Sequence, residues 1–230
     1  MIELIDAVKT YEQGRRVVQA VRGVSLTIQG GEFVTIMGPS GSGKSTLMHL
    51  MGALDTPSGG RAVFQGQDLQ TMTDTQRSLL RRTRIGFVFQ AFNLLPTLTA
   101  AENVALPLLL DKRNRKESIA RACAALERVG LAHRAEHFPE EMSGGEMQRT
   151  AVARALVGEP EAVLCDEPTG NLDSANSREI LTLLAGLPEP GRRAVIMVTH
   201  DQNAAQYGTR IVRLRDGLLE SDAPVTGPRP

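Results

Sequence analysis

The chain has 230 residues, enough to bury a sizeable core in one large domain or in a core with an inserted lobe. Lys and Arg together number 26, and so do Asp and Glu, so the net charge is zero and gives no overall attraction to nucleic acid or anionic lipid. The longest apolar run, 104–110, has seven residues, far fewer than the ~20 that cross a bilayer. No apolar run at the N-terminus suits a signal peptide, so we expect a soluble, cytoplasmic protein. From the zero net charge we expect no nucleic-acid partner.

The first half of the chain alternates apolar strand patterns with helical patterns. In one of these stretches Val24, Leu26 and Ile28 alternate with polar residues, which is typical of a strand with one buried face. Asp74 is expected to cap a helix. We predict strands at 2–8, 20–28, 32–37, 61–65 and 85–90, and helices at 47–54 and 74–82.

The second half begins with a long stretch, 91–158, that shows only helix and loop patterns, including a helix at 117–130. Strand and helix patterns then resume, with strands expected at 162–166, 194–199 and 210–214 and a helix at 174–185. This order indicates a mostly parallel α/β core interrupted by a helical lobe. We predict a single domain over 1–222, with its core at 1–90 and 159–222 and a helical subdomain at 91–158, and then a disordered, proline-containing tail at 223–230.

A glycine-rich segment joins the apolar strand at 32–37 to the following helix and matches G-x-x-x-x-G-K-[ST], the phosphate-binding loop. Its glycines let the backbone turn tightly so that consecutive N–H groups face an anion, and the helix adds its positive dipole end. Lys44 can reach the β- and γ-phosphates, and the Ser45 hydroxyl can bind Mg²⁺. The nucleotide-binding residues predicted here are Gly38, Pro39, Ser40, Gly41, Ser42, Gly43, Lys44, Ser45 and Thr46.

Two acids follow the apolar strand at 162–165. In a phosphate-loop protein, a second strand that ends in a carboxylate places an acid beside Mg²⁺. Asp166 suits this metal role, and Glu167, one position further on, can orient or deprotonate an attacking water molecule.

A second glycine-containing helix start is formed by Ser143, Gly144 and Gly145. A serine at this position is usually only an N-cap, but the two glycines also make the helix end suitable for an anion. The segment lies about twenty residues before the acidic strand, and this order of motifs is more informative than either segment alone.

With these segments in this order, the chain resembles the ATP-binding subunit of an ABC transporter from Ile2 to about Glu220. The resemblance implies a P-loop NTPase core with a mostly parallel sheet, an N-terminal antiparallel β portion and an inserted helical subdomain. It also implies ATP and Mg²⁺ as cofactors and a head-to-tail homodimer, in which each ATP lies between one phosphate loop and the other subunit's Ser143-Gly144-Gly145 segment. The matching elements are the phosphate loop, Gln90, Ser143-Gly144-Gly145, Asp166-Glu167, Asn171-Leu172-Asp173 and His200.

The resemblance further implies roles for residues that carry little signal by themselves. Tyr11 would stack on adenine, Gln90 would contact Mg²⁺ and the attacking water, and His200 would contact the γ-phosphate. Asp173 would bridge the two subunits near the catalytic Glu167. The expected catalytic set is Lys44, Gln90, Glu167 and His200, and the expected metal set is Ser45, Gln90 and Asp166.

One position departs from the family pattern, because the usual Leu-Ser-Gly-Gly-Gln is Met142-Ser143-Gly144-Gly145-Glu146 in this chain. Methionine keeps the apolar anchor. Glu146 favours the helix as an acid in its first turn, but it also lies near the expected phosphates, so its part in nucleotide binding stays open.

Within the family, segments such as Asn93-Leu94-Leu95 and Glu102-Asn103-Val104 resemble those of bacterial macrolide exporters, lipoprotein-releasing complexes and the cell-division ABC pair. The resemblance implies a motor ATPase that drives a separate membrane permease from the cytoplasmic face of the inner membrane. Apolar residues at 92–110 either form a groove for a permease helix or hold the lobe together. A soluble ABC ATPase of iron–sulfur cluster assembly is the alternative, whereas a GTPase would need an Asn-Lys-x-Asp motif, which the sequence lacks.

Overall fold

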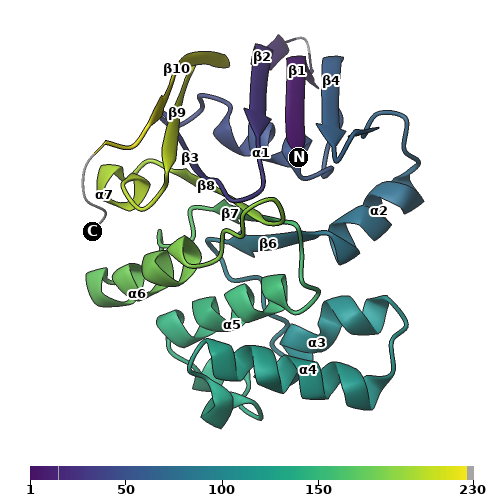
Figure 1. Ribbon diagram of the computed structural model, residues 1–230, viewed down its shortest axis with the longest axis vertical. Helices are drawn as coiled ribbons and strands as arrows, with labels where there is room; N and C mark the ends of the chain where they lie inside the picture. Colours follow the sequence, from purple (N-terminus) through teal and green to yellow (C-terminus); the bar gives the residue numbers. More distant parts are fainter. Residues whose placement is uncertain (15, 227–230) are drawn as a thin grey trace.

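The structure, a computed structural model, describes residues 1–14 and 16–226 and contains two β-sheets with helices packed around them (Figure 1). The strands are β1 (Ile2–Gln13), β2 (Arg16–Ile28), β3 (Phe33–Met37), β4 (Gly59–Phe64), β5 (Gln67–Asp68), β6 (Ile85–Phe89), β7 (Ala162–Asp166), β8 (Ala194–Thr199), β9 (Arg210–Arg215) and β10 (Leu218–Pro224). The larger sheet has the order β10-β9-β3-β8-β7-β6 and is parallel except for β10. The smaller sheet, β2-β1-β4-β5, is antiparallel.

The helices are α1 (Lys44–Met51), α2 (Asp74–Thr83), α3 (Ala100–Leu110), α4 (Arg115–Arg128), α5 (Gly144–Leu156), α6 (Ser174–Ala185) and α7 (Gln202–Ala205). Short 3₁₀ turns lie at Ala132–Arg134 and Pro139–Glu141. Among the helices of the described ranges, none is long and apolar enough to cross a membrane.

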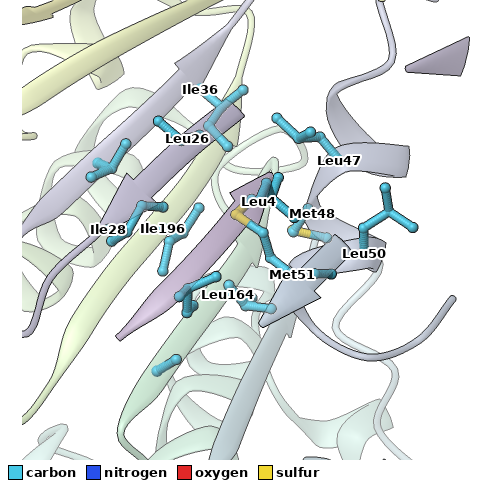
Figure 2. Packing of buried hydrophobic residues seen from close by; sticks show 14 of the residues in the cluster. Leu4, Leu26, Ile28, Ile36, Leu47, Met48, Leu50, Met51, Leu164 and Ile196 are labelled. Carbon is cyan, nitrogen blue, oxygen red and sulfur yellow. The ribbon is translucent and has the colours of Figure 1, made fainter. Parts of the chain in front are cut away.

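Helix α1 lies between the two sheets, because it contacts β1, β2 and β4 on one side and β7 and β8 on the other. Its apolar residues Leu47, Met48, Leu50 and Met51 are fully buried. Figure 2 shows Met48 and Met51 beside Leu4 of the small sheet, with Leu164 and Ile196 of the large sheet close by. These residues belong to the largest core cluster. Burial of each large apolar side chain stabilises the fold by roughly 1.5–3 kcal/mol.

A helical lobe formed by α3, α4 and α5 has a core of its own, which includes Val104, Leu126 and Ala153 (Figure 1). Helix α5 also packs on β6 and α6, so it connects the lobe to the large sheet. Thr99 begins α3 with a capping box in which the Thr99 side chain accepts from the N–H of Glu102, and the Glu102 side chain accepts from the N–H of Thr99.

The predicted α/β fold with a mostly parallel sheet is confirmed, and α6 coincides with the helix predicted at 174–185. The predicted start of the tail at 223 is wrong, since Ala223 and Pro224 pair with Ile211 and Arg210 as the end of β10. Two ion pairs hold this strand, from Arg210 to Asp222 at 2.5 Å and from Arg215 to Glu220 at 3.6 Å. The last part of the predicted tail, 227–230, lies outside the described residues.

Candidate functional site

The phosphate loop connects the fully buried strand β3 to the first turn of α1. Two of its glycines are required by close backbone contacts. A Cβ atom on Gly38 would overlap with the carbonyl oxygen of Leu214 on β9, and one on Gly43 would overlap with that of Ala20 on β2. Gly43 also has φ 97°, a left-handed conformation that side chains disfavour. The loop is therefore held between both sheets.

Lys44, the first residue of α1, extends over the inside of the loop, and its ammonium donates to the carbonyl oxygens of Gly38 at 2.9 Å and Pro39 at 2.8 Å. The side chain is almost fully buried. This geometry places one positive charge at the centre of a backbone loop that lies at a helix N-terminus, which is the arrangement that binds phosphate groups.

A cavity of about 570 Å³ opens at this loop and brings together residues from distant parts of the chain. Gln90, Glu167 and His200 follow the carboxyl ends of the parallel strands β6, β7 and β8, and these ends lie at one edge of the sheet. The lining residues are Ala20, Ser40, Gly41, Gly43, Lys44, Ser45, Thr46, Gln90, Glu167 and His200. Ligands of open α/β sheets bind at this edge.

Asp166 and Glu167 have different surroundings. The hydroxyl of Ser45 donates to Asp166 Oδ1 at 3.4 Å. Burial raises the pKa of Asp166, while the nearby His49 and Ser45 act in the opposite direction. Glu167 has φ 47°, and its carboxylate oxygens lie 2.7–2.8 Å from Nδ1 of the more exposed His200. Asp166 is thus directed at the phosphate loop, and Glu167 is paired with His200.

Gln90 is held by a residue of the loop that follows the two acids. Its Nε2 donates to Asn171 Oδ1 at 3.1 Å, and Asn171 Nδ2 donates back to the carbonyl oxygen of Gln90 at 3.1 Å. The neighbouring Gly170 leaves no space for a Cβ atom, which would lie 2.7 Å from Gln90 Nε2. Asn171 was part of the predicted motif, but its contact with Gln90 was not predicted.

Ser143 caps α5, outside the lining of this cavity, and it is exposed. It forms a capping box with Glu146, whose Oε2 accepts from the N–H of Ser143 at 2.8 Å. The other oxygen of Glu146 accepts from Arg134 Nε at 2.8 Å. The Ser143 N–H lowers the pKa of Glu146 to about 2 in spite of partial burial, and Arg134 acts in the same direction. The S-x-x-E spacing could have predicted this capping role from the sequence, and a contact between Glu146 and nucleotide stays a prediction.

Asp173 lies close to the glycines that follow Ser143. It caps α6 by accepting from the N–H groups of Ala175 and Asn176, each at 2.9 Å, and it accepts from Asn176 Nδ2 at 2.7 Å. A Cβ atom on Gly145 would overlap with the Asn176 side chain. Asn176 therefore fixes the distance between the Asp173 loop and the start of α5, a role that the sequence did not predict.

Tyr11, the residue expected to stack on adenine, lies on β1 opposite Val18 of β2 and is partly buried. Its hydroxyl donates to Asp55 Oδ2 at 2.9 Å. Tyr11 does not belong to the lining of the cavity at the phosphate loop, so its role in base binding stays a prediction.

The fold and the cavity together define a phosphate-loop protein with an acid–histidine pair beside the loop. Residues 21–170 match the family described as ABC transporter, and this match covers more than half of the chain. The chain therefore belongs to the ABC transporter family, as predicted.

Several relatives are similar over nearly the whole of this chain. The macrolide export ATP-binding/permease protein MacB of Syntrophobacter fumaroxidans is 47% identical and covers 100% of this chain, although this chain covers 32% of that protein. The ABC transporter ATP-binding protein MJ0796 of Methanocaldococcus jannaschii is 44% identical, with 99% of this chain and 98% of that protein covered. The chain thus spans about a third of the MacB protein and nearly all of MJ0796.

Two solved structures of the MJ0796 cassette have the same fold. A dimeric post-hydrolysis state bound to ADP and Pi has a TM-score of 0.90 at 43% identity and covers 99% of this chain and 100% of that chain. A second dimeric structure also has a TM-score of 0.90, at 44% identity and with the same coverage. These similarities agree with the predicted branch, which includes macrolide exporters.

Proposed function

We propose that this chain is the ATP-hydrolysing motor subunit of a bacterial ABC transporter. The observation that carries the proposal is the cavity in which the phosphate loop meets Gln90, Glu167 and His200. The triphosphate would lie on the loop, where Lys44 supplies the positive charge and backbone N–H groups supply directed donors. Tyr11 would provide an aromatic face for the adenine.

The residues beside the loop suit Mg²⁺. Ser45 and Asp166 offer a hydroxyl and a carboxylate oxygen at one place, and Gln90 lines the same cavity with an amide oxygen. Mg²⁺ prefers oxygen ligands and is commonly held by one or two carboxylates together with water and substrate phosphates. A bound Mg²⁺ would neutralise charge on the phosphates, and the charge of the cation would favour the ionised form of Asp166.

Glu167 is the proposed general base for the attacking water. Its carboxylate belongs to the cavity lining and is held by His200. A carboxylate in this place can remove a proton from water as the water attacks the γ-phosphate, while His200 contacts the phosphate. Gln90, fixed by Asn171, would orient that water.

The proposed active form is a head-to-tail homodimer. Ser143 is exposed at the N-terminus of α5, where the backbone of the first turn and the helix dipole can meet an anion. The γ-phosphate on one subunit would contact the Ser143 segment of its partner, with Asp173 near the partner's site. The solved relative MJ0796 is dimeric, which supports the proposal.

We expect Ser143→Arg to block ATP-driven dimerisation and to leave ATP binding by the monomer nearly unchanged. The arginine would fill the space in which the partner's γ-phosphate must dock, but Ser143 is outside the ATP cavity of its own subunit. Light scattering with and without Mg-ATP measures the dimer. Thr75→Arg, at an exposed position on α2, adds the same side chain elsewhere and is the control. Dimerisation of the Ser143 variant with ATP would contradict the head-to-tail arrangement.

A second cavity, also about 570 Å³, suits a helix of a membrane permease. It lies between α2, β6, α3 and α5, with an apolar surface from Phe87, Phe89 and Leu106. Val104 and Leu108 hold the lobe together, whereas Leu110 at this cavity is 63% exposed. The apolar residues at 92–110 therefore divide between the lobe core and this groove, and a groove of this kind accepts an amphipathic helix. Through it the chain would be held at the cytoplasmic face of the inner membrane.

We expect Leu110→Glu to reduce co-purification with a membrane permease from detergent-solubilised membranes by about tenfold or more. The substitution would place a charge where an apolar helix face should dock, and buried unpaired charges are costly. Leu218→Glu, at an exposed leucine of β10, is the matched control and should retain the partner. Equal recovery of the permease with both variants would show that the groove is not the docking site.

A further inference from the structure

Three side chains, two from the small sheet and one from the turn after α1, form a connected cluster at the proposed base site. Lys9 and Tyr11 lie two positions apart on β1, and both side chains reach Asp55. Asp55 accepts from both of them, from Lys9 Nζ at 2.5 Å through Oδ1 and from the Tyr11 hydroxyl at 2.9 Å through Oδ2. The Lys9 ammonium also lies 5.1 Å from the centre of the Tyr11 ring. The Tyr11 ring is thus held both at its tip and over its face.

Asp55 belongs to the turn that ends the phosphate-loop helix. Its N–H bonds to the carbonyl oxygen of His49 on α1, at 3.3 Å, and its Oδ1 accepts from the N–H of Thr56 at 2.7 Å. Ser58, a few residues further on, bonds to β1 through its N–H to the carbonyl oxygen of Val8 and through its hydroxyl, which accepts from the N–H of Thr10. One short segment therefore connects the helix that carries Lys44 to the strand that carries Tyr11.

We propose that Asp55 is a positioning residue for nucleotide binding, which sets the Tyr11 ring at a fixed distance and angle from the phosphate loop. The inference rests on the proposed function, in which Tyr11 stacks on adenine. A base that stacks on a ring contributes most when the ring is already in place, because a mobile ring must lose rotational freedom on binding. Asp55 removes that freedom before the nucleotide arrives.

The charges of the cluster fit this role. Burial would raise the pKa of Asp55, but hydrogen bonds from Lys9 and from the Thr56 N–H lower it, so the carboxylate stays ionised as an acceptor. Burial and the hydrogen bond to Asp55 raise the pKa of Tyr11, so its phenol stays a donor. Lys9 balances the carboxylate charge, and its ammonium also donates to the carbonyl oxygen of Thr56 at 2.9 Å. The negative charge of Asp55 is therefore compensated within the cluster and does not oppose the triphosphate.

The test compares Asp55→Ala, Tyr11→Phe and the double variant. Phenylalanine keeps the stacking face but removes the hydroxyl that Asp55 holds. We expect the Kd and KM for Mg-ATP to rise about three- to tenfold in each single variant, which corresponds to the loss of one hydrogen bond of ordinary net strength, with kcat at saturating ATP within about twofold of wild type. In the double variant the rise should equal that of Asp55→Ala alone, because Tyr11→Phe then has no contact with Asp55 left to remove.

The exposed Glu12, next to Tyr11 on β1, supplies the matched control, since Glu12→Ala removes a carboxylate nearby without touching the cluster. It should leave KM unchanged. Effects of Asp55→Ala and Tyr11→Phe that multiply in the double variant, or a fall in kcat with KM unchanged, would overturn the positioning role. If Asp55→Ala does not fold, an unchanged KM in Tyr11→Phe is enough to overturn it. Absence of ATP binding by the wild type would instead refute the proposed function.

Discussion

Glu167→Gln should slow ATP hydrolysis by ~10²–10⁴-fold, or roughly 3–5 kcal/mol on the barrier, which is the usual contribution of a general base. Glutamine keeps the shape and hydrogen-bonding reach of the side chain beside His200 but cannot accept the proton from water. ATP binding should not weaken, because the substitution removes a negative charge near the γ-phosphate. The variant should therefore accumulate as an ATP-bound dimer, which single-turnover hydrolysis and gel filtration with Mg-ATP would measure.

The neighbouring acid provides the control for this experiment. Asp166 contacts Ser45 of the phosphate loop, so Asp166→Asn should impair Mg²⁺ placement and the complex that precedes hydrolysis, as well as turnover. It should form less of the ATP-bound dimer than Glu167→Gln. If the Glu167 variant hydrolysed ATP at the wild-type rate, or stayed monomeric with ATP bound, the base would be a different residue.

Lys44→Ala should abolish measurable turnover and weaken ATP binding. Lys44 is almost fully buried, and its ammonium places a positive charge inside the loop, next to the carbonyl oxygens of Gly38 and Pro39. Without it, the β- and γ-phosphates would face these oxygens with less compensation, and the charge that develops on phosphoryl transfer would be poorly stabilised. Equilibrium dialysis with ATP and a steady-state phosphate-release assay would measure the two effects.

Lys116→Ala is a suitable comparison, because Lys116 is exposed on α4 and its removal makes the same change in net charge. That variant should bind and hydrolyse ATP as the wild type does. Wild-type ATP affinity in Lys44→Ala would refute the assignment of the loop.

Much of the fold could be predicted because local patterns and final structure agree. The buried strand β3 follows from its short apolar, β-branched run, and the helix α6 begins at the N-cap Asp173. Strand β10 could not be predicted in this way. Its sequence, Leu218–Pro224, shows no alternation of apolar and polar residues, and it becomes a strand because β9 lies beside it and Arg210 pairs with Asp222. The pairing of β10 with β9 depends on contacts between separate segments, which the pattern of residues within one segment does not reveal.

The same distinction applies to the site. The phosphate loop, Gln90, Glu167 and His200 could be predicted to share one cavity, because each follows a parallel strand and these strands end at one edge. The contacts of Asp55 with Tyr11, and the close approach of Asn176 to Gly145, could not be predicted, since no strand order or motif spacing brings these pairs together. The residues proposed to bind the phosphates could therefore be predicted more readily than the residues that hold them in place.

The position of α1 between the two sheets has a consequence for the dynamics of the phosphate loop. A surface loop usually opens in local fluctuations that cost far less free energy than unfolding of the whole protein. Here the helix that follows the loop is buried in the largest core cluster, and Gly38 and Gly43 contact backbone of both sheets. Displacing either end of the loop would therefore disturb that core, so opening these ends should cost more free energy than opening an ordinary surface loop. Any local fluctuation of the folded domain should then be confined to the exposed residues between the ends, 39–41.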